Sequence, residues 1–207
     1  SYAGESYETS KKDIFGYTYK EVDGKETGKY IANKTVEVKY IYTKNTGDIT
    51  KNEVTKTGPE YMTDINGKFN YTLDYVGRVE KYVGNATLTL TDKLPYEIDE
   101  DSLEMDDRCS YSNGVITCTT TYDIEENTDI EESFSISLVY KNLSTDIVTN
   151  KVSSKLELDK TYKDDSDEVE TKMYKGSLEV TYIDTDENEI AEKITGTKYA
   201  GESYETS

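Results

Sequence analysis

Three residues with reactive side chains occupy positions that their neighbours predict to lie inside a β-sheet core. Successive side chains of a strand point to opposite faces of the sheet, so residues two apart share a face. By this count Lys56 shares a face with Val54, and Asp92 continues the apolar face of Leu90. Asn150 is in phase with the valines two residues before and after it. A lysine, an aspartate and an asparagine are therefore expected to point into one interior.

Burial of such groups would change their chemistry. A low-dielectric interior favours the neutral amine of a lysine and the neutral acid of an aspartate, and a neutral amine is a nucleophile. Lys56 could attack the side-chain amide carbon of Asn150, with Asp92 polarising the carbonyl and passing the proton to the departing ammonia. The product is an intramolecular isopeptide bond that ties the first strand of a domain to its last. The alternative is that Lys56 extends to solvent, Asp92 caps a turn and Asn150 binds backbone.

Alternating apolar and polar residues predict the strands that would carry this site. The alternation covers residues 69–75, 86–91, 133–138 and 148–159, and Glu53–Gly58 precedes them. Short strands separated by turn signals, without a helical pattern, predict an all-β chain with a central immunoglobulin-like sandwich. Residues 159–174 are charged throughout and are expected to form a linker, so the domain with its linkers is placed at 45–174.

The two cysteines flank a hairpin signal. Asn113-Gly114 predicts a two-residue type I′ turn, which places Cys109 opposite Cys118 in a non-hydrogen-bonded pair. Cα atoms about 4.5 Å apart in such a pair are within reach of a disulfide. We expect a disulfide and hence an oxidising, extracellular setting, with two buried thiols as the alternative. Metal binding is disfavoured because the chain has no histidine and no second cysteine pair.

The two ends of the chain share a sequence. Tyr2–Ser10 recurs letter for letter as Tyr199–Ser207. An identity of this kind predicts one period of a longer array, cut within a module. Strand patterns at 16–22, 35–42 and 177–183 indicate that residues 1–44 and 175–207 are two parts of one small module. The tail of one molecule could then complete the head of the next by strand addition, or the two ends could fold back together.

Two resemblances support this organisation. When 175–207 is joined to 11–44, the segments Gly176–Ile190, Gly201–Tyr204, Phe15–Tyr17 and Val36–Lys44 resemble the MucBP repeat of Gram-positive surface proteins. That resemblance implies a β-grasp-like module, with residues 1–44 its C-terminal part and 175–207 the N-terminal part of the next. Some members of the family adhere to mucins or glycans.

The central segment resembles a second family. Lys56-Thr57-Gly58, then Leu88–Pro95, then Val148–Val152 occur in the order seen in collagen-adhesin (CnaA-type) immunoglobulin-like domains of Gram-positive adhesins and pilins. That resemblance implies a bond between Lys56 and Asn150, assisted by Asp92.

Charge and missing motifs exclude several functions. The formal net charge is −19, which disfavours nucleic acids and anionic membranes as partners. No phosphate loop, cofactor motif or activated nucleophile of an enzyme is present. Asp184-x-Asp186-x-Asn188 begins like a calcium loop but lacks its glycine and bidentate glutamate, and acidic residues at 99–101 and 106–107 are expected to be solvated rather than to bind a cation.

The expected function is a non-enzymatic stalk or spacer repeat of a bacterial cell-surface adhesin, stabilised by the isopeptide bond. The alternative is a module that binds mucin glycans or a host matrix protein. In that case a set of tyrosines in residues 1–44 could stack on sugars: Tyr17, Tyr19, Tyr40 and Tyr42. Neighbouring repeats, joined head to tail, are the other expected partners.

Overall fold

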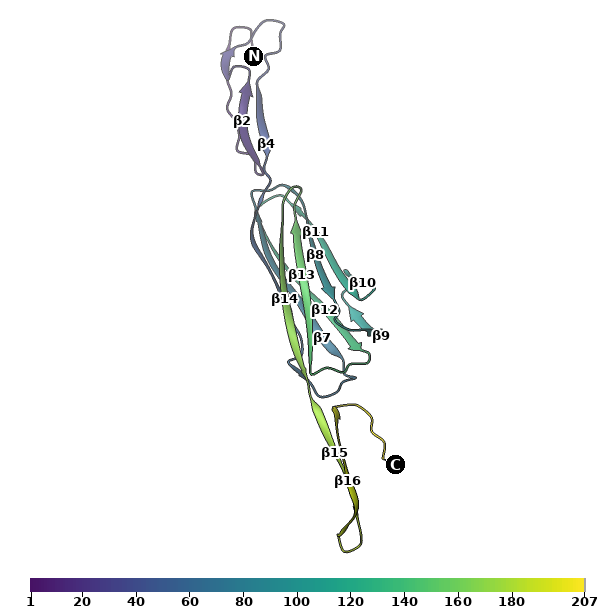
Figure 1. The fold of residues 1–207 in the computed structure, drawn as a ribbon. Coiled ribbons are helices and arrows are strands. Elements are labelled where there is room, and N and C mark those ends of the chain that lie inside the picture. The colour runs from purple at the N-terminus through teal and green to yellow at the C-terminus, as the bar shows by residue number, and fades with distance from the viewer. Residues whose placement is uncertain (207) are drawn as a thin grey trace.

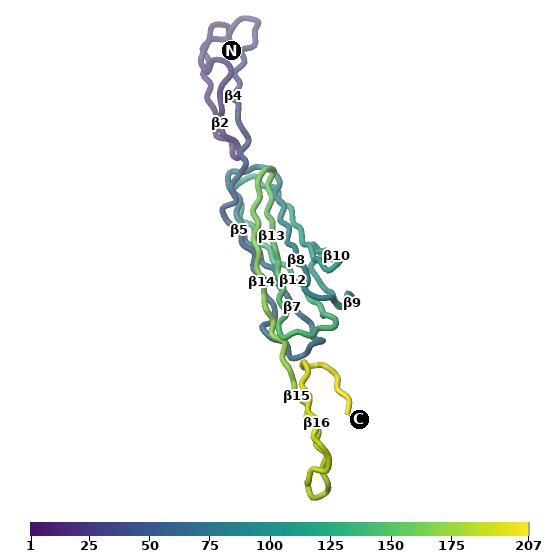
Figure 2. The backbone as a smooth tube through the Cα atoms, in the orientation of Figure 1, coloured from purple at the N-terminus to yellow at the C-terminus, as the bar shows by residue number. Residues whose placement is uncertain are grey.

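A computed structural model describes residues 1–206 and contains sixteen β-strands and no helix. The strands run along the long axis of an elongated molecule with three parts in line (Figure 1). A sandwich lies in the middle, and the head segment (residues 1–44) and the described part of the tail segment (residues 175–207) lie at opposite ends (Figure 2). The predicted all-β class is confirmed. Within the described residues there is no helix of the length and apolarity that crossing a membrane requires.

Two sheets form the central sandwich. The four-stranded sheet has the order β5-β7-β12-β9, with bounds Asp48–Thr57, Phe69–Glu80, Thr128–Tyr140 and Ile98–Met105. The six-stranded sheet has the order β10-β11-β8-β13-β14-β6, with bounds Cys109–Ser112, Val115–Ile124, Gly84–Lys93, Ile147–Glu157, Tyr162–Met173 and Tyr61–Met62. Pairing is antiparallel except between β14 and β6.

The core lies entirely within this sandwich. Every buried apolar side chain of the described chain falls between Ile49 and Met173. The predicted alternation is confirmed, because the inward residues of β7 are at most 1% exposed from Phe69 to Tyr75, whereas the residues between them are not buried. The inward apolar residues of β8, β12 and β13 pack against those of β7 in the same core.

The prediction of a linker at 159–174 is wrong. Residues 162–173 form β14, which pairs with β13 at eleven successive positions. Its inward face begins with two half-buried acids, Asp165 and Asp167, and becomes apolar only at Val169 and Met173. The strand therefore alternates in the usual way, but its first half carries no hydrophobic signal.

The cysteine hairpin has the predicted register. Cys109 pairs with Cys118 across β10 and β11, and Ser112 pairs with Val115 next to the turn. Asn113 and Gly114 have φ of 50° and 79°, as a type I′ turn requires. A disulfide joins the two cysteines, whose Cα atoms are 4.0 Å apart. It lies on β10, the edge strand of the six-stranded sheet.

The end segments contain only two-stranded sheets. In the head segment β1 (Ser6–Glu8) pairs with β3 (Thr27–Lys29), and β2 (Tyr17–Asp23) pairs with β4 (Lys39–Lys44). The strand predicted at 35–42 begins only at Lys39, because β2 ends opposite that residue. In the tail segment β15 (Lys175–Ile183) pairs with β16 (Glu189–Tyr199). At the turn between them, the Asp184 carboxylate accepts hydrogen bonds from the backbone of Asp186 and Asn188.

Candidate isopeptide site

The three predicted residues lie in the core of the sandwich. Lys56 is on β5, Asp92 on β8 and Asn150 on β13, and they are 4%, 0% and 1% exposed. The Lys56 ammonium nitrogen donates to Asp92 Oδ2 in an ion pair. Among the described residues, Lys56 is the only buried basic residue and Asp92 the only buried acidic residue. Isolated charges are costly in such a setting, so each depends on the other.

The backbone register explains how the site is assembled. Asp92 faces Val152 in the β8–β13 ladder, and Asn150 is the inward residue two positions earlier on β13. Asp92 and Asn150 are thus diagonal neighbours on one face of the six-stranded sheet. Lys56 comes from the other sheet, where it pairs with Leu73 of β7, and its side chain crosses the interior to reach them.

Aromatic rings enclose the lysine. The Lys56 ammonium nitrogen is 4.3 Å from the centre of the Tyr71 ring, an arrangement that favours a cation on a desolvated ring face. The Tyr71 hydroxyl is hydrogen-bonded to the hydroxyl of Tyr140 at 3.1 Å. Phe69 packs edge-on against Tyr140, with ring centres 4.9 Å apart. These side chains hold the lysine in an apolar cage and exclude solvent from it.

Burial moves both ionisable groups toward their neutral forms. Desolvation lowers the pKa of Lys56, although the neighbouring Asp92 carboxylate opposes part of that change. Desolvation likewise raises the pKa of Asp92, against the effects of Lys56 and of the Asn150 amide. Transfer of one proton from lysine to aspartate gives an amine and an acid. This pair of protonation states suits attack on an amide.

The amide beside them lacks conventional partners. Neither the nitrogen nor the oxygen of the Asn150 side chain has a hydrogen bond of normal geometry, and Asp92 Oδ1 also lacks one. Asn150 nevertheless lies close enough to act on the pKa of Asp92 and of Tyr71. Buried polar atoms are nearly always hydrogen-bonded, so three unpaired atoms at one place call for an explanation.

Sequence reasoning missed a second set of contacts at this site. The backbone N–H of Val54 donates to Asp165 at 2.9 Å, and that of Lys56 donates to Asp167 at 2.7 Å. β5 is an edge strand of its sheet, and these two carboxylates of β14 satisfy its outward N–H groups. The signal was present in the two-residue spacing of Asp165 and Asp167, ahead of Val169 on the same face.

The position of Asn150 also corrects one expectation. Asn150 is on the penultimate strand of the sandwich, because β14 follows β13. β14 lies beside β5, and the two strands run parallel, since Val54 faces Asp165 and Lys56 faces Asp167. The first and last strands of the sandwich therefore lie side by side.

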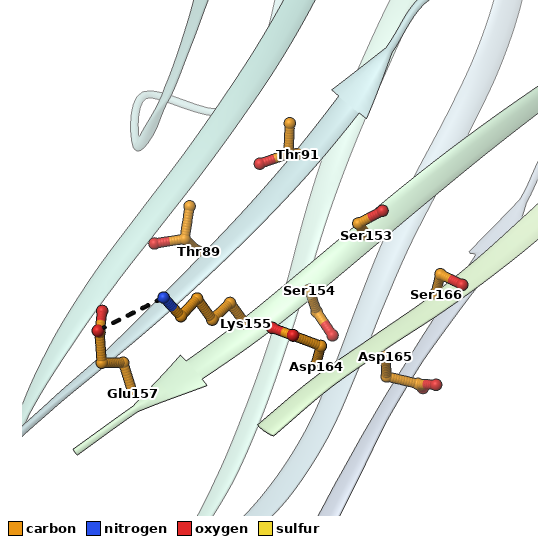
Figure 3. Close-up of a pocket in the computed structure, with 9 residues that line it drawn as sticks. All are labelled: Thr89, Thr91, Ser153, Ser154, Lys155, Glu157, Asp164, Asp165 and Ser166. Atoms are coloured by element: carbon orange, nitrogen blue, oxygen red, sulfur yellow. Dashed lines mark ion pairs between the residues drawn. The ribbon is translucent and has the colours of Figure 1, made fainter. Parts of the chain in front are cut away.

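A surface hollow of the sandwich lies elsewhere. Figure 3 shows it over β8, β13 and β14, with small hydroxyl residues such as Thr91 and Ser153 and an ion pair between Lys155 and Glu157. None of the three residues of the isopeptide site lines it. Among the described residues, no cluster of three acidic or cysteine side chains is arranged to hold a metal ion.

Comparison with known families identifies the two ends of the chain. The MucBP domain profile matches residues 1–43 and 177–207 and leaves out the sandwich. The match to the MucBP domain is therefore split across the two end segments. No curated protein matches the chain.

The solved structures that resemble the chain include Gram-positive pilins. The full-length major pilin SpaD of Corynebacterium diphtheriae is 14% identical with a TM-score of 0.46, over 66% of this chain and 38% of that one. The major pilin subunit BcpA of Bacillus cereus is 13% identical with a TM-score of 0.46, over 83% of this chain and 65% of that one. The match thus spans less than two thirds of either pilin.

Specific contacts fasten both the head segment and the tail segment to the sandwich. In the head, Lys44 forms an ion pair with Asp159 at 2.6 Å. In the tail, Lys175 forms one with Asp146 at 2.9 Å, and the backbone N–H of Ile65 donates to the carbonyl of Ala200 at 2.7 Å. Each junction therefore contains an ion pair, and the tail junction adds a backbone hydrogen bond.

Proposed function

We propose that this chain is a structural repeat of a Gram-positive cell-surface adhesin or stalk, stabilised by an isopeptide bond between Lys56 and Asn150. The observation that carries the proposal is the buried cluster of Lys56, Asp92 and Asn150, in which an amine, an acid and an unpaired amide meet in an apolar cage. The repeat comprises a sandwich at 45–174 between MucBP parts at 1–44 and 175–207.

The proposed reaction uses only groups of the chain. A proton passes from the Lys56 ammonium to Asp92, and the neutral amine attacks Cγ of Asn150. Asp92 donates a hydrogen bond to the amide oxygen while charge develops there, then delivers its proton to Nδ2. The Cγ–Nδ2 bond breaks and ammonia leaves, while the Nζ–Cγ bond remains. Nζ gives its surplus proton to the Asp92 carboxylate, so the new amide is neutral and Asp92 ends protonated. The reaction occurs once in each molecule, so the protein is the substrate of its own chemistry and is not an enzyme.

The bond would protect the domain against tension along its axis. Tension applied through the end segments reaches the sandwich at the start of β5 and the end of β14. These two strands lie parallel along the long axis (Figure 2). The side-chain contacts between these strands would be sheared. A covalent link from β5 to β13 would carry the load past all of the strands between them, and this property is what a stalk needs.

Intact mass spectrometry tests the proposal. The purified chain should weigh one ammonia less than its sequence, after allowance for the two hydrogens lost with the disulfide. Lys56→Ala and Asn150→Ala should each restore the missing ammonia. Lys151→Ala, which removes an exposed lysine next to Asn150, should keep the deficit. A full-mass chain, or an unchanged deficit in Lys56→Ala, would reject the bond.

The setting and partners follow from the same proposal. The Cys109–Cys118 disulfide suits an oxidising, extracellular location on the bacterial surface. Neighbouring repeats are the partners that the split MucBP domain needs. Recognition of mucin glycans or a matrix protein is less well supported, because the hydroxyls of Tyr40 and Tyr42 are already hydrogen-bonded to Thr9 and Lys12 of the same segment. A glycan-array screen would distinguish the two roles.

A further inference from the structure

The nine residues shared by both ends adopt the same turn at each end. The backbone N–H of Glu5 donates to the carbonyl of Tyr2 at 3.2 Å, and that of Glu202 donates to Tyr199 at 3.1 Å. In both copies the glutamate side chain accepts from the tyrosine N–H, at 3.0 Å and 2.7 Å. The glycine between them has φ of 91° in each copy. The shared segment therefore forms the same turn at both ends of the chain.

Beyond the turn, the two copies have different surroundings. In the head, Ser6–Glu8 forms β1 and pairs with β3. Its Tyr7 packs edge-on against Tyr30, with ring centres 5.7 Å apart, and lies so close to Gly28 that a Cβ there would be 2.6 Å from the Tyr7 hydroxyl. In the tail, the corresponding residues form no strand within the described chain, and Tyr204 is 64% exposed.

Both end segments also have apolar faces without a core. Val38 and Tyr40 are half-buried on one face of the head, as are Leu178 and Val180 in the tail, yet no buried apolar side chain of the described chain lies in either segment. A two-stranded sheet of this kind is marginally stable in water until something covers its apolar face.

The two segments have complementary charge. Residues 1–44 carry eight lysines and seven acidic residues, although the chain as a whole is strongly acidic. Residues 175–207 carry three lysines and eight acidic residues. Opposite net charges favour encounter between these two segments over encounter between two heads or two tails. The two segments of one chain lie at opposite ends of the molecule (Figure 2), so the partner must be another copy.

We propose that two copies of this chain join by strand exchange. Ser203–Glu205 of one copy replaces Ser6–Glu8 of the next beside β3, and Tyr204 takes the place of Tyr7 over Gly28. Because the incoming residues are identical to those that they replace, they can make the same contacts with β3 and Gly28. The hairpin β15–β16, which directly precedes the exchanged residues, then covers the apolar face of the head and supplies the driving force. The contact is heterologous and does not close, so it extends into a linear assembly.

This inference rests on the proposed role as a repeat but not on the isopeptide bond. If the chain lacks one ammonia but its copies do not associate, the strand exchange is rejected and the isopeptide bond stands. If the copies associate but the chain has its full mass, the isopeptide bond is rejected and the exchange stands.

One substitution, made at each copy of the tyrosine, tests the exchange. Tyr7→Ala weakens the occupant that must leave, so it should strengthen association. Tyr204→Ala weakens the occupant that enters, so it should weaken association. Loss of one packed aromatic contact corresponds to a change of about tenfold in the dissociation constant in each case. The double variant should return close to the wild-type value.

Sedimentation equilibrium of the purified chain at several concentrations measures these dissociation constants. Val180→Asp, which places a charge on the apolar face of the hairpin, should abolish association without affecting the sandwich. The exchange is rejected if Tyr7→Ala and Tyr204→Ala shift association in the same direction. It is also rejected if the wild-type chain and the Tyr7→Ala variant are both monomeric at the highest soluble concentration.

Discussion

Pulling on the chain from its two ends provides the sharpest test of the covalent link. With a bond between Lys56 and Asn150, tension bypasses residues 57–149, and only the segments outside the bond can extend. Those segments are residues 45–55 on β5 and 151–173 on β13 and β14. Asn150→Ala removes the bond but leaves the Lys56–Asp92 ion pair in place, so the domain is expected to fold.

The structure determines how much length each form can release. The 34 sandwich residues outside the bond correspond to about 120 Å of extended chain at about 3.5 Å per residue. The 93 residues enclosed by the bond correspond to about 330 Å more. Single-molecule force spectroscopy under reducing conditions should therefore show an additional length of about 330 Å in Asn150→Ala compared with the wild type.

The disulfide provides an internal calibration for this experiment. It encloses residues 110–117, so the Asn150→Ala variant should release about 30 Å less when oxidised than when reduced. Wild type should show no such dependence on reductant, because its disulfide lies inside the bypassed segment. A wild-type chain that releases the full length, or that lengthens on reduction, would refute the proposed bond.

Three further changes probe the site and its surroundings. Asp92→Asn should slow bond formation by about 10²–10⁴-fold, seen as delayed loss of ammonia in the intact mass after refolding, and formation at the wild-type rate would exclude a proton-transfer role. Tyr71→Phe leaves the buried Tyr140 hydroxyl without its partner and should cost about 1–2 kcal/mol in chemical denaturation. Burial raises the pKa of Tyr71 to about 12 from 10.0, so its contribution of about 2–3 kcal/mol is present below pH 10 and is lost as pH rises through about 12. Tyr71→Phe should reduce the alkaline loss of stability by that amount without abolishing it, because burial also raises the pKa of Tyr75, Tyr122 and Tyr140. Replacing Cys109 and Cys118 by serine should cost about 2–3 kcal/mol and increase hydrogen exchange mainly in β10, and an effect spread over both sheets would contradict an edge-strand role.

The sequence alone determined the features that depend on local geometry. Side chains of a strand alternate between two faces, so the inward phase of Lys56, Asp92 and Asn150 could be read from their neighbours. The Asn113-Gly114 turn defined the hairpin register and so the pairing of the two cysteines. The nine residues shared by the two ends of the chain were enough to indicate a split module.

Only the tertiary structure decided which distant groups meet. The acidic start of β14 has no hydrophobic pattern, and its role appears only because the fold places Asp165 and Asp167 beside the unpaired N–H groups of β5. The same packing makes β13 the penultimate strand and lets Lys56 reach Asp92 from the opposite sheet. The physical reason is that these partners are more than 35 residues apart along the chain. In addition, the donors on β5 are backbone N–H groups, which every non-proline residue carries, so the sequence of β5 does not reveal which of them the Asp165 and Asp167 side chains will meet.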